Sequence, residues 1–561
     1  MNWFLGVFAL AIILFLIYNY RKKKRETKRR KILNNLVQNW GNHKKHDHFY
    51  FPSIEKYFIN NNQKEKSYHI ISDRCATDID VNETFKIIDR TSSRIGQQYL
   101  YYKLRTIESK NNLFIFSKLT VFFEENEELR LKVQLELLKI NSDDSYNFEN
   151  LVTSKPIEKP KLINLVYAFT IASITCVFLG IFFPVFLIFL IPILGVNIAF
   201  HYKNKWNISN YIEGVSQLSK ALIVAQNITR FPEIKKYFVD LTFIREIEKI
   251  KLKTEFISFE RNSNDEFTLV LSLLTGFIKV FFNLEYIVFY SFIESITNKK
   301  QELEKMFRFI GEIDAAISTA SVKVSKYKIC NPIFIDEKKI IVTQISHPLI
   351  ENCVLNDLNL SNSSLLLTGS NMSGKTTFIR SVSINSVLAQ TLNICFAQEY
   401  CAPFFKLFSS IRINDNLLEN TSYYLEEVLT IKELIEESQD GNPCLFVLDE
   451  IFKGTNTIER ISAGKAILSF LNKGSNIVLV STHDIELTDI LSKENFDLYH
   501  FSEQIDDNQL TFDHKLKEGK LKTRNAIKIL ELYNYPSEII NDAKSTEKST
   551  FGNSQKSIKN N

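Results

Sequence analysis

Hydrophobic side chains form two long uncharged runs in this 561-residue chain, at residues 1–20 and 162–200. A helix of about 20 apolar residues crosses a bilayer, so the first run predicts one transmembrane anchor. The second run is long enough for two spans with a turn near Gly180–Pro184, and it predicts a membrane hairpin. A cleaved signal peptide is the alternative for the first run, and a buried core hairpin is the alternative for the second.

Positive charge borders both long runs. Residues 21–31 carry nine basic side chains and one acidic one. Lysines also precede and follow the second run, at Lys159, Lys161, Lys203 and Lys205. Because positive flanks stay in the cytosol, we expect three spans in a plasma or inner membrane, with the remaining domains cytoplasmic.

A weaker apolar block at residues 268–293 contains Lys279 and Glu285. Charged side chains are costly in the hydrocarbon core of a bilayer. The block therefore predicts a buried or interfacial helix rather than a fourth span.

A short apolar run, Leu365–Leu367, leads into a glycine-rich stretch with the P-loop spacing G-x-x-x-x-G-K-[ST]. The stretch is Gly369, Ser370, Asn371, Met372, Ser373, Gly374, Lys375, Thr376 and Thr377. Small residues let backbone N–H groups surround phosphate oxygens, Lys375 reaches the terminal phosphates, and Thr376 offers a hydroxyl to Mg²⁺. The motif predicts a strand, a phosphate-binding loop and a helix that together bind ATP and Mg²⁺.

Two further apolar runs end in polar residues and predict two more strands of the same sheet. Residues 444–448 end in Asp449 and Glu450, and residues 477–480 lead to His483. In nucleotide hydrolases the first such carboxylate holds Mg²⁺ and the second activates the attacking water. With His483 placed to sense the γ-phosphate or order the water, the three strands predict an ATP hydrolase.

These motifs resemble those of the MutS family of DNA mismatch-repair ATPases. The Asn371–Met372 pair is unusual among P-loops and matches that family. Asp449–Thr457 is similar to its Walker B segment and following loop, although Phe452–Lys453 stands where Gly-Arg is usual. Residues 481–483 match the family's switch.

The resemblance covers residues 80–140 and 300–545. It implies an ABC-type α/β P-loop ATPase domain beside an all-α core and lever region, here with transmembrane helices. It also implies a homodimer in which a signature segment of the partner closes over each nucleotide. Residues 420–427 occupy that position, where Ser422 would contact the γ-phosphate; the alternative is that they merely begin an amphipathic helix.

The predicted organisation follows from these assignments. It consists of an anchor at 1–20, a basic linker and undefined segment at 21–80, a MutS-like helical core and lever at 81–335 with the hairpin at 162–200, an ABC-type ATPase domain with C-terminal dimerisation helices at 336–545, and a disordered tail at 546–561.

The family resemblance favours DNA binding, whereas two features of the sequence argue against it. Mismatch-recognising members of the family carry an N-terminal domain with a wedge phenylalanine, and we expect that domain to be lacking before residue 80. The net charge is +5, of which residues 21–31 contribute +8, so the remainder is slightly acidic and lacks the positive footprint of a strong duplex binder. Two hypotheses result: a membrane-anchored MutS-like ATPase that binds DNA and is related to mismatch repair, or a membrane ATPase that acts on a membrane or protein partner without DNA.

Overall fold

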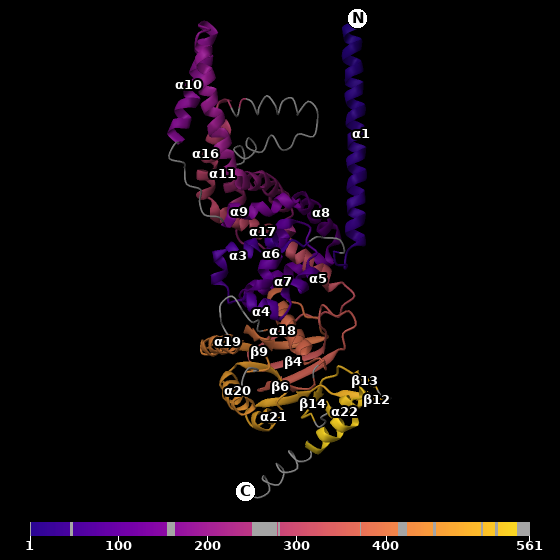
Figure 1. Ribbon diagram of the computed structural model, residues 1–561. Coiled ribbons are helices and arrows are strands. Elements are labelled where there is room, and N and C mark those ends of the chain that lie inside the picture. Colours follow the sequence, from indigo (N-terminus) through magenta and orange to yellow (C-terminus); the bar gives the residue numbers. More distant parts are fainter. Residues whose placement is uncertain are drawn as a thin grey trace. The chain divides into compact units, whose positions relative to one another are not determined.

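The computed structural model divides the chain into two compact units (Figure 1). The helical unit comprises residues 1–67 and 85–326, and the sheet unit comprises residues 68–84 and 327–561. The described residues are 2–44, 49–153, 163–249, 278, 281–370, 372–412, 423–452, 456–506, 509–521 and 526–546. The segment 68–84 thus belongs to the sheet unit although its neighbours on both sides belong to the helical unit. The predicted organisation gives residues 68–80 no fold and places residues 81–84 in the helical core.

The helical unit is built around α17. Its helices are α1 (Asn2–Gln38), α2 (Phe51–Ile54), α3 (Lys56–Asn60), α6 (Arg94–Arg105), α7 (Lys110–Glu125), α8 (Glu127–Leu137), α9 (Phe148–Thr153), α10 (Ile163–Phe182), α11 (Phe186–Ile228), α12 (Pro232–Lys235), α13 (Phe243–Glu248), α16 (Leu284–Thr297) and α17 (Lys300–Lys323), while α5 (Val81–Ile88) joins the two units along the chain. Ile310, Ile313 and Ile317 of α17 are fully buried, and α17 packs against α6 and α7. Burial of this apolar face is the main stabilising contribution to the bundle.

The contact between α6 and α17 is unusually close. The Ser93 side chain caps α6 by accepting the Gly96 N–H, and the Asp314 carboxylate of α17 accepts the Ser92 and Ser93 N–H groups, each at 2.8 Å. It also accepts the Ser93 hydroxyl at 2.6 Å. Burial raises the pKa of Asp314 to about 6. Gly96 faces this carboxylate, because an added Cβ would lie only 2.1 Å from Asp314 Oδ2.

The first helix extends well beyond the predicted anchor. Helix α1 continues through the basic run to Gln38, and the residues after it are fastened to the bundle. The Arg130 guanidinium lies 3.6 Å from the Trp40 ring centroid, the Gly41 N–H donates to Ser321 Oγ at 3.1 Å, and Lys44 pairs with Asp89 at 2.9 Å. The stretch predicted as a linker therefore contains the second half of α1 and the residues that attach this helix to the bundle.

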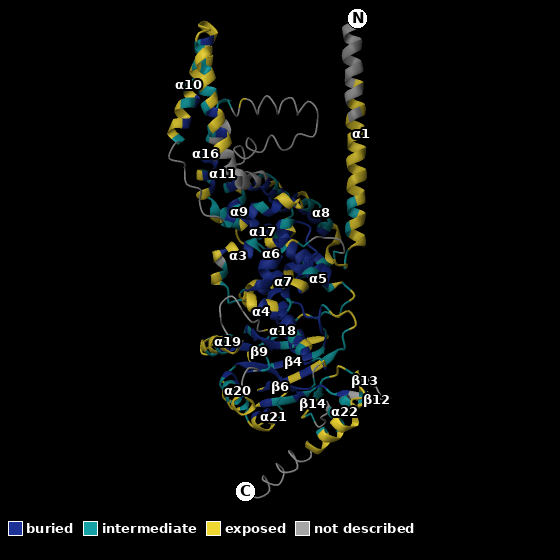
Figure 2. Ribbon diagram, in the orientation of Figure 1, coloured by how far each residue is buried: buried dark blue, intermediate teal, exposed yellow. Residues whose placement is uncertain are grey.

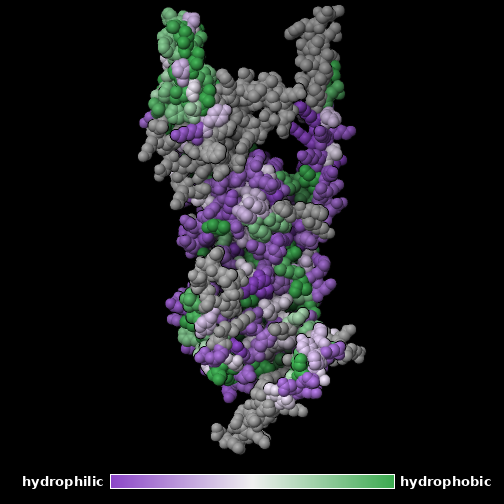
Figure 3. Space-filling view, in the orientation of Figure 1, coloured by the Kyte–Doolittle hydropathy of each residue, from purple (hydrophilic) through white to green (hydrophobic). Residues whose placement is uncertain are grey.

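Two of the described helices are long and apolar enough to cross a membrane, over residues 163–182 and 186–203. They form the hairpin of α10 and α11, and they coincide with the predicted run at 162–200. Figure 2 colours many residues along them as exposed, and Figure 3 shows that this surface is hydrophobic. Most side chains of residues 1–20, the predicted anchor, lie outside the described residues.

The end of the weaker apolar block packs against the hairpin. Asn197 of α11 donates to the Phe281 carbonyl at 2.8 Å, and Thr170 of α10 donates to the Phe282 carbonyl at 3.0 Å. Further along α16, Tyr290 and Phe292 are buried. From Leu284 on, the block is thus a packed helix, whereas residues 268–277, 279 and 280 lie outside the described residues.

The sheet unit contains a six-stranded sheet in the order β14-β11-β6-β10-β9-β8. Its strands are β6 (Ser364–Thr368), β8 (Lys406–Ser410), β9 (Cys444–Asp449), β10 (Ile477–Thr482), β11 (Phe496–His500) and β14 (Lys517–Glu518). All are parallel to their neighbours except β14. The three strands predicted from the sequence are the adjacent central strands β6, β10 and β9, which confirms that part of the fold.

Helices and a smaller sheet complete this unit. They are α4 (Asp73–Asp78), α18 (Lys375–Leu392), α19 (Tyr423–Glu437), α20 (Thr457–Leu471), α21 (Glu486–Leu491) and α22 (Ala526–Leu532), a second sheet β3-β7-β4-β5 (Ile333–Ile335, Glu399–Pro403, Lys339–Ile345, Asn356–Ser361), and the hairpin of β12 (Glu503–Asp506) and β13 (Gln509–Phe512). Residues of α19, α20 and α21 form one apolar cluster with β9 and β10, and α18 also contacts these two strands. The covered parallel sheet explains why its strands read as continuous apolar runs.

Candidate functional site

The candidate site lies where β6, β9 and β10 end. Ser481 is paired with Asp449, and Thr482 with Thr368, so the carboxyl ends of the three strands coincide. Parallel strands place the residues that follow them at one edge of the sheet, which is the usual position of ligand sites in such sheets. The loops after these strands therefore bring the predicted residues together.

The glycine-rich loop between β6 and α18 depends on glycine backbone geometry. Gly374, directly before α18, has φ +111°, and Gly369 has φ +155°. An added Cβ at Gly369 would lie 2.9 Å from both the Phe501 carbonyl oxygen and Ser373 Oγ. The sequence thus selects glycine at both ends of the loop.

Lys375 is the first residue of α18 and points back over this loop. Its ammonium donates to the carbonyls of Gly369 and Ser370, each at 2.8 Å, and Nζ lies 3.3 Å from His483 Nε2. Only 6% of the residue is exposed. A cation held at the mouth of a backbone loop and a helix N-terminus is suited to phosphate oxygens.

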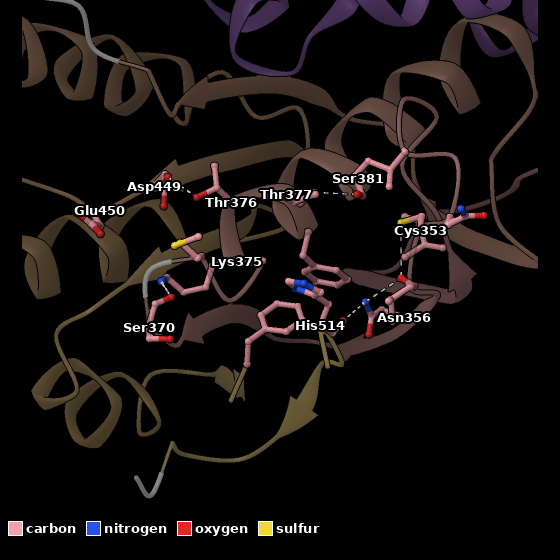
Figure 4. Close-up of a pocket in the computed structure, with 18 of the residues that line it drawn as sticks. Cys353, Asn356, Ser370, Lys375, Thr376, Thr377, Ser381, Asp449, Glu450 and His514 are labelled. Carbon is pink, nitrogen blue, oxygen red and sulfur yellow. Dashed lines mark hydrogen bonds between the residues drawn. The ribbon is translucent and has the colours of Figure 1, made fainter. Parts of the chain in front are cut away.

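Two carboxylates and two hydroxyls lie beside the lysine. Thr376 donates to Asp449 Oδ2 at 2.8 Å (Figure 4). The Ser481 hydroxyl donates to the other oxygen of Asp449. Glu450 Oε1 lies 2.8 Å from His483 Nε2. Glu450 also has φ +57°, a conformation that costs a non-glycine residue roughly 1–3 kcal/mol and clusters at functional sites.

These groups line one end of a cavity of 530 Å³. The other end is lined by residues that the sequence analysis did not identify, namely Ile345, Ile350, Val354, Phe378, Phe501 and His514. His514 Nδ1 lies 3.0 Å from the Ser373 carbonyl, and Asn356 donates to the His514 carbonyl at 3.0 Å (Figure 4). The cavity therefore has a polar end and an apolar end, within the volume range of small-molecule sites.

Two predicted site residues, Asn371 and Ser422, lie outside the described residues. Of the others, Met372 is 83% exposed, Ser373 is buried, and Thr377 lines the cavity. The structure thus brings together the polar residues predicted from three separate strands. It adds an apolar lining that no local pattern predicts, because its members come from β4, α18 and three separate loops.

The donors fit the ligands that the motifs imply. Thr376 and Asp449 present two hard oxygen atoms 2.8 Å apart, as Mg²⁺ prefers. The glycine cradle leaves no room for a Cβ at Gly369, and the lysine is held beside it. An elongated ligand fits this cavity when its anionic end lies beside the lysine and its aromatic end lies among the apolar side chains.

Comparison with known proteins identifies this region. MutS domain V matches residues 365–550. The DNA mismatch repair protein MutS of Staphylococcus haemolyticus is 29% identical over 331 residues, which are 56% of this chain and 37% of that protein. The protein of the same name from Listeria welshimeri is 31% identical over 272 residues, which are 46% of this chain and 31% of that protein. The chain thus spans less than two fifths of these curated relatives, and its match to MutS domain V extends over residues 365–550.

Proposed function

We propose that this protein is a membrane-anchored MutS-like ATPase that binds Mg·ATP in the sheet unit and hydrolyses it. The observation that carries the proposal is the convergence of Lys375, the Thr376–Asp449 pair and the Glu450–His483 pair in one cavity. Each pair joins residues from two strand ends, since Thr376 follows β6, Asp449 and Glu450 lie at the end of β9, and His483 follows β10. Their meeting is therefore a property of the fold. The match to MutS domain V over the same residues supports the assignment.

Each residue of the polar end has a role in this proposal. The backbone N–H groups of the glycine loop and Lys375 hold the phosphates, and Lys375 exchanges its carbonyl partners for phosphate oxygens. Thr376 and Asp449 hold Mg²⁺, which neutralises charge that develops on the phosphates. Glu450 accepts a proton from the attacking water, and His483, 2.8 Å from it, orders that water or senses the γ-phosphate.

The apolar end of the cavity suits the adenine base. Val354, Phe378 and Phe501 offer apolar contact, and the His514 ring offers a flat face. Aromatic and imidazole rings stack on planar bases, with the gain coming mainly from buried area. In this proposal the apolar half of the cavity contributes to the affinity for ATP, whereas the side chains of the polar half carry out hydrolysis.

A dimer fits the exposed surface near the site. Tyr424, Leu425 and Leu429 of α19 are 44–50% exposed, and Met372 of the loop is 83% exposed. Large apolar residues gathered on an exposed surface mark interaction sites. We propose that a second copy covers them and that Ser422, which directly precedes α19, contributes to the nucleotide of that copy.

The membrane assignment rests on the hairpin of α10 and α11. Its apolar side chains face outward, which is unfavourable in water and favourable in lipid. With lysines at both ends of the hairpin, the ATPase domain faces the cytoplasm.

Glu450→Gln tests the ATPase proposal, since glutamine keeps the size of the side chain and removes the base. We expect ATP affinity within about threefold of wild type and turnover reduced at least about 100-fold, the usual contribution of a general base. Glu459→Gln, an exposed carboxylate in the first turn of α20, is the matched control. Undiminished turnover of Glu450→Gln would remove Glu450 from its role.

The relatives bear the name DNA mismatch repair protein, so DNA is the first candidate partner. A membrane or protein partner without DNA is the second, and the acidic remainder of the chain favours it. Filter binding to duplex, mismatched and branched DNA at two salt concentrations separates the two. Salt-sensitive, structure-selective binding supports a DNA role, whereas no binding by an active ATPase supports the second.

A further inference from the structure

The segment 68–84, which we call the crossing segment, leaves the helical unit, joins the sheet unit and returns at Phe85. We propose that Asp80 of this segment is a positioning residue that couples the nucleotide site to the crossing segment through Arg380. This inference rests on the proposed ATPase function and adds a route by which nucleotide binding is passed on.

The crossing segment is fixed to the last strand of the sheet. The Asp78 carboxylate accepts the Ser409 hydroxyl at 2.7 Å, the Ile411 N–H at 3.1 Å and the Arg412 N–H at 2.8 Å. Asp78 is 1% exposed, so these are buried, charge-assisted hydrogen bonds. Near the other end of the segment, a His69 ring nitrogen lies 2.8 Å from the Leu407 carbonyl of β8. The segment therefore moves with this strand as one body.

Asp80 joins this body to the helix of the phosphate loop. Its Oδ1 accepts Arg412 Nη2 at 2.9 Å, and its Oδ2 lies 3.5 Å from Arg380 Nη1 of α18. Arg412 also donates to the Thr77 carbonyl at 2.8 Å. Asp80 has φ +55°, a strained conformation for a non-glycine residue. One carboxylate is thus held between two arginines that come from different elements.

Arg380 connects this cluster to the magnesium-binding end of the site. It lies five residues after Lys375 on α18. Burial and Arg412 lower its pKa, whereas Asp80, Asp78 and Asp449 raise it. Arg380 also lies about one helical turn after Thr376 on α18, so the two side chains share a face of the helix, and Thr376 donates to Asp449, the proposed magnesium ligand, at 2.8 Å. Among the described residues nothing accepts its buried Nε–H, so its hydrogen bonding is incomplete and open to rearrangement.

The coupling follows from charge. Binding of Mg·ATP changes the net charge at the Thr376–Asp449 pair, and the total electrostatic force on the Arg380 side chain changes with it. The position of Arg380, and with it the strength of its attraction to Asp80, then changes. Asp80 is followed directly by α5, along which the chain enters the helical unit. The crossing segment is thereby a covalent path from the nucleotide site toward the helices.

Asp80→Asn tests this coupling in the full-length protein in detergent, with Asp80→Glu as the conservative variant. Asp73→Asn is the matched control, because Asp73 is an exposed carboxylate of the same segment. The readouts are kcat and KM for ATP, and hydrogen exchange of peptides within residues 75–84 with and without Mg²⁺ and a non-hydrolysable ATP analogue.

In wild type and Asp73→Asn we expect the nucleotide to slow exchange in the crossing segment. In Asp80→Asn we expect this protection to be lost and kcat to fall by about 5- to 150-fold, the usual range of coupling free energies, with KM little changed. Asp80→Glu should restore most of both. If Asp80→Asn does not fold, Arg380→Lys, which keeps the charge and loses the planar fork, takes its place with the same expectations.

The outcomes are distinguishable. Wild type that binds no ATP refutes the proposed function itself. Wild type that binds ATP without any change in exchange of the crossing segment refutes the coupling alone, as does an Asp80→Asn variant that behaves like wild type in both readouts. A melting temperature measured without nucleotide separates loss of coupling from loss of folding.

Discussion

Replacing Gly96 with alanine tests the packing of α6 on α17. The new Cβ would lie 2.1 Å from Asp314 Oδ2 and 2.5 Å from Asp314 Cβ and Cγ. No ordinary non-bonded contact is this short, so either the two helices separate or the Asp314 side chain turns away. Turning away breaks its three hydrogen bonds to the N-terminus of α6.

The magnitude follows from these two routes. Overpacking a tight core costs about 1–3 kcal/mol. Each lost hydrogen bond to a charged group lowers the free energy of unfolding by about 1.5–3 kcal/mol, whereas the better helix propensity of alanine raises it by about 1 kcal/mol. Overpacking together with the loss of one of the three hydrogen bonds, less the propensity gain, lowers the free energy of unfolding by about 3 kcal/mol. For a helical unit of about 310 residues, with an unfolding entropy of about 2.1 cal/mol/K per residue, this lowers the melting temperature by about 5 °C.

The assay is thermal unfolding of the detergent-solubilised protein, followed by intrinsic fluorescence. Gly464→Ala is the matched control, because it lies inside helix α20 and its new Cβ meets no atom within 4 Å. This control should leave stability unchanged or raise it by up to about 1 kcal/mol. A Gly96→Ala protein that melts within about 1 °C of wild type would refute the close approach of the two helices, since that shift corresponds to well under 1 kcal/mol.

Three other predictions use the same protein. Lys375→Ala should weaken ATP binding at least about 10-fold, because it removes a charged hydrogen-bond donor, and unchanged affinity in a fluorescent-nucleotide titration contradicts the phosphate-loop assignment. Burial lowers the pKa of His69 to about 4, so its folded form stays neutral while the unfolded chain gains a proton as pH falls below 6.5. The contribution of His69 to stability should therefore fall between pH 6.5 and 4, by about 2 kcal/mol at pH 5. In urea titrations the stability of wild type relative to His69→Gln should fall by this amount over that range, and an equal pH dependence in both proteins argues against it. Finally, the full chain should stay in the membrane pellet after alkaline carbonate extraction, and its release into the supernatant would speak against a spanning hairpin.

The sequence predicts those parts of the fold that local patterns determine. The continuous apolar runs before Gly369 and Asp449 indicate strands because both faces of their sheet are covered, and the run at 162–200 indicates a helical pair because it is long, mainly apolar and carries no charged side chain. The spacing around Lys375 indicates the phosphate loop because backbone geometry requires glycine there.

Other parts depend on partners far away along the chain. Asp78 is held by residues more than 330 positions further on, and nothing in its own neighbourhood predicts them. The apolar end of the cavity is likewise formed by Val354, Phe501 and His514, which lie on separate loops. Such residues carry no periodic signal, so only the folded chain reveals them.

Helix α11 runs without interruption for 43 residues, from the turn of the hairpin to the helical bundle. At 1.5 Å per residue it is about 64 Å long, so a tilt of about 5° at its inner end displaces the outer end by about 6 Å, roughly one helical pitch. With the hairpin in a bilayer, a small movement of the bundle would displace the outer end of α11 at the opposite face of the membrane. The protein could thus report its nucleotide state across a lipid barrier without moving any solute through it.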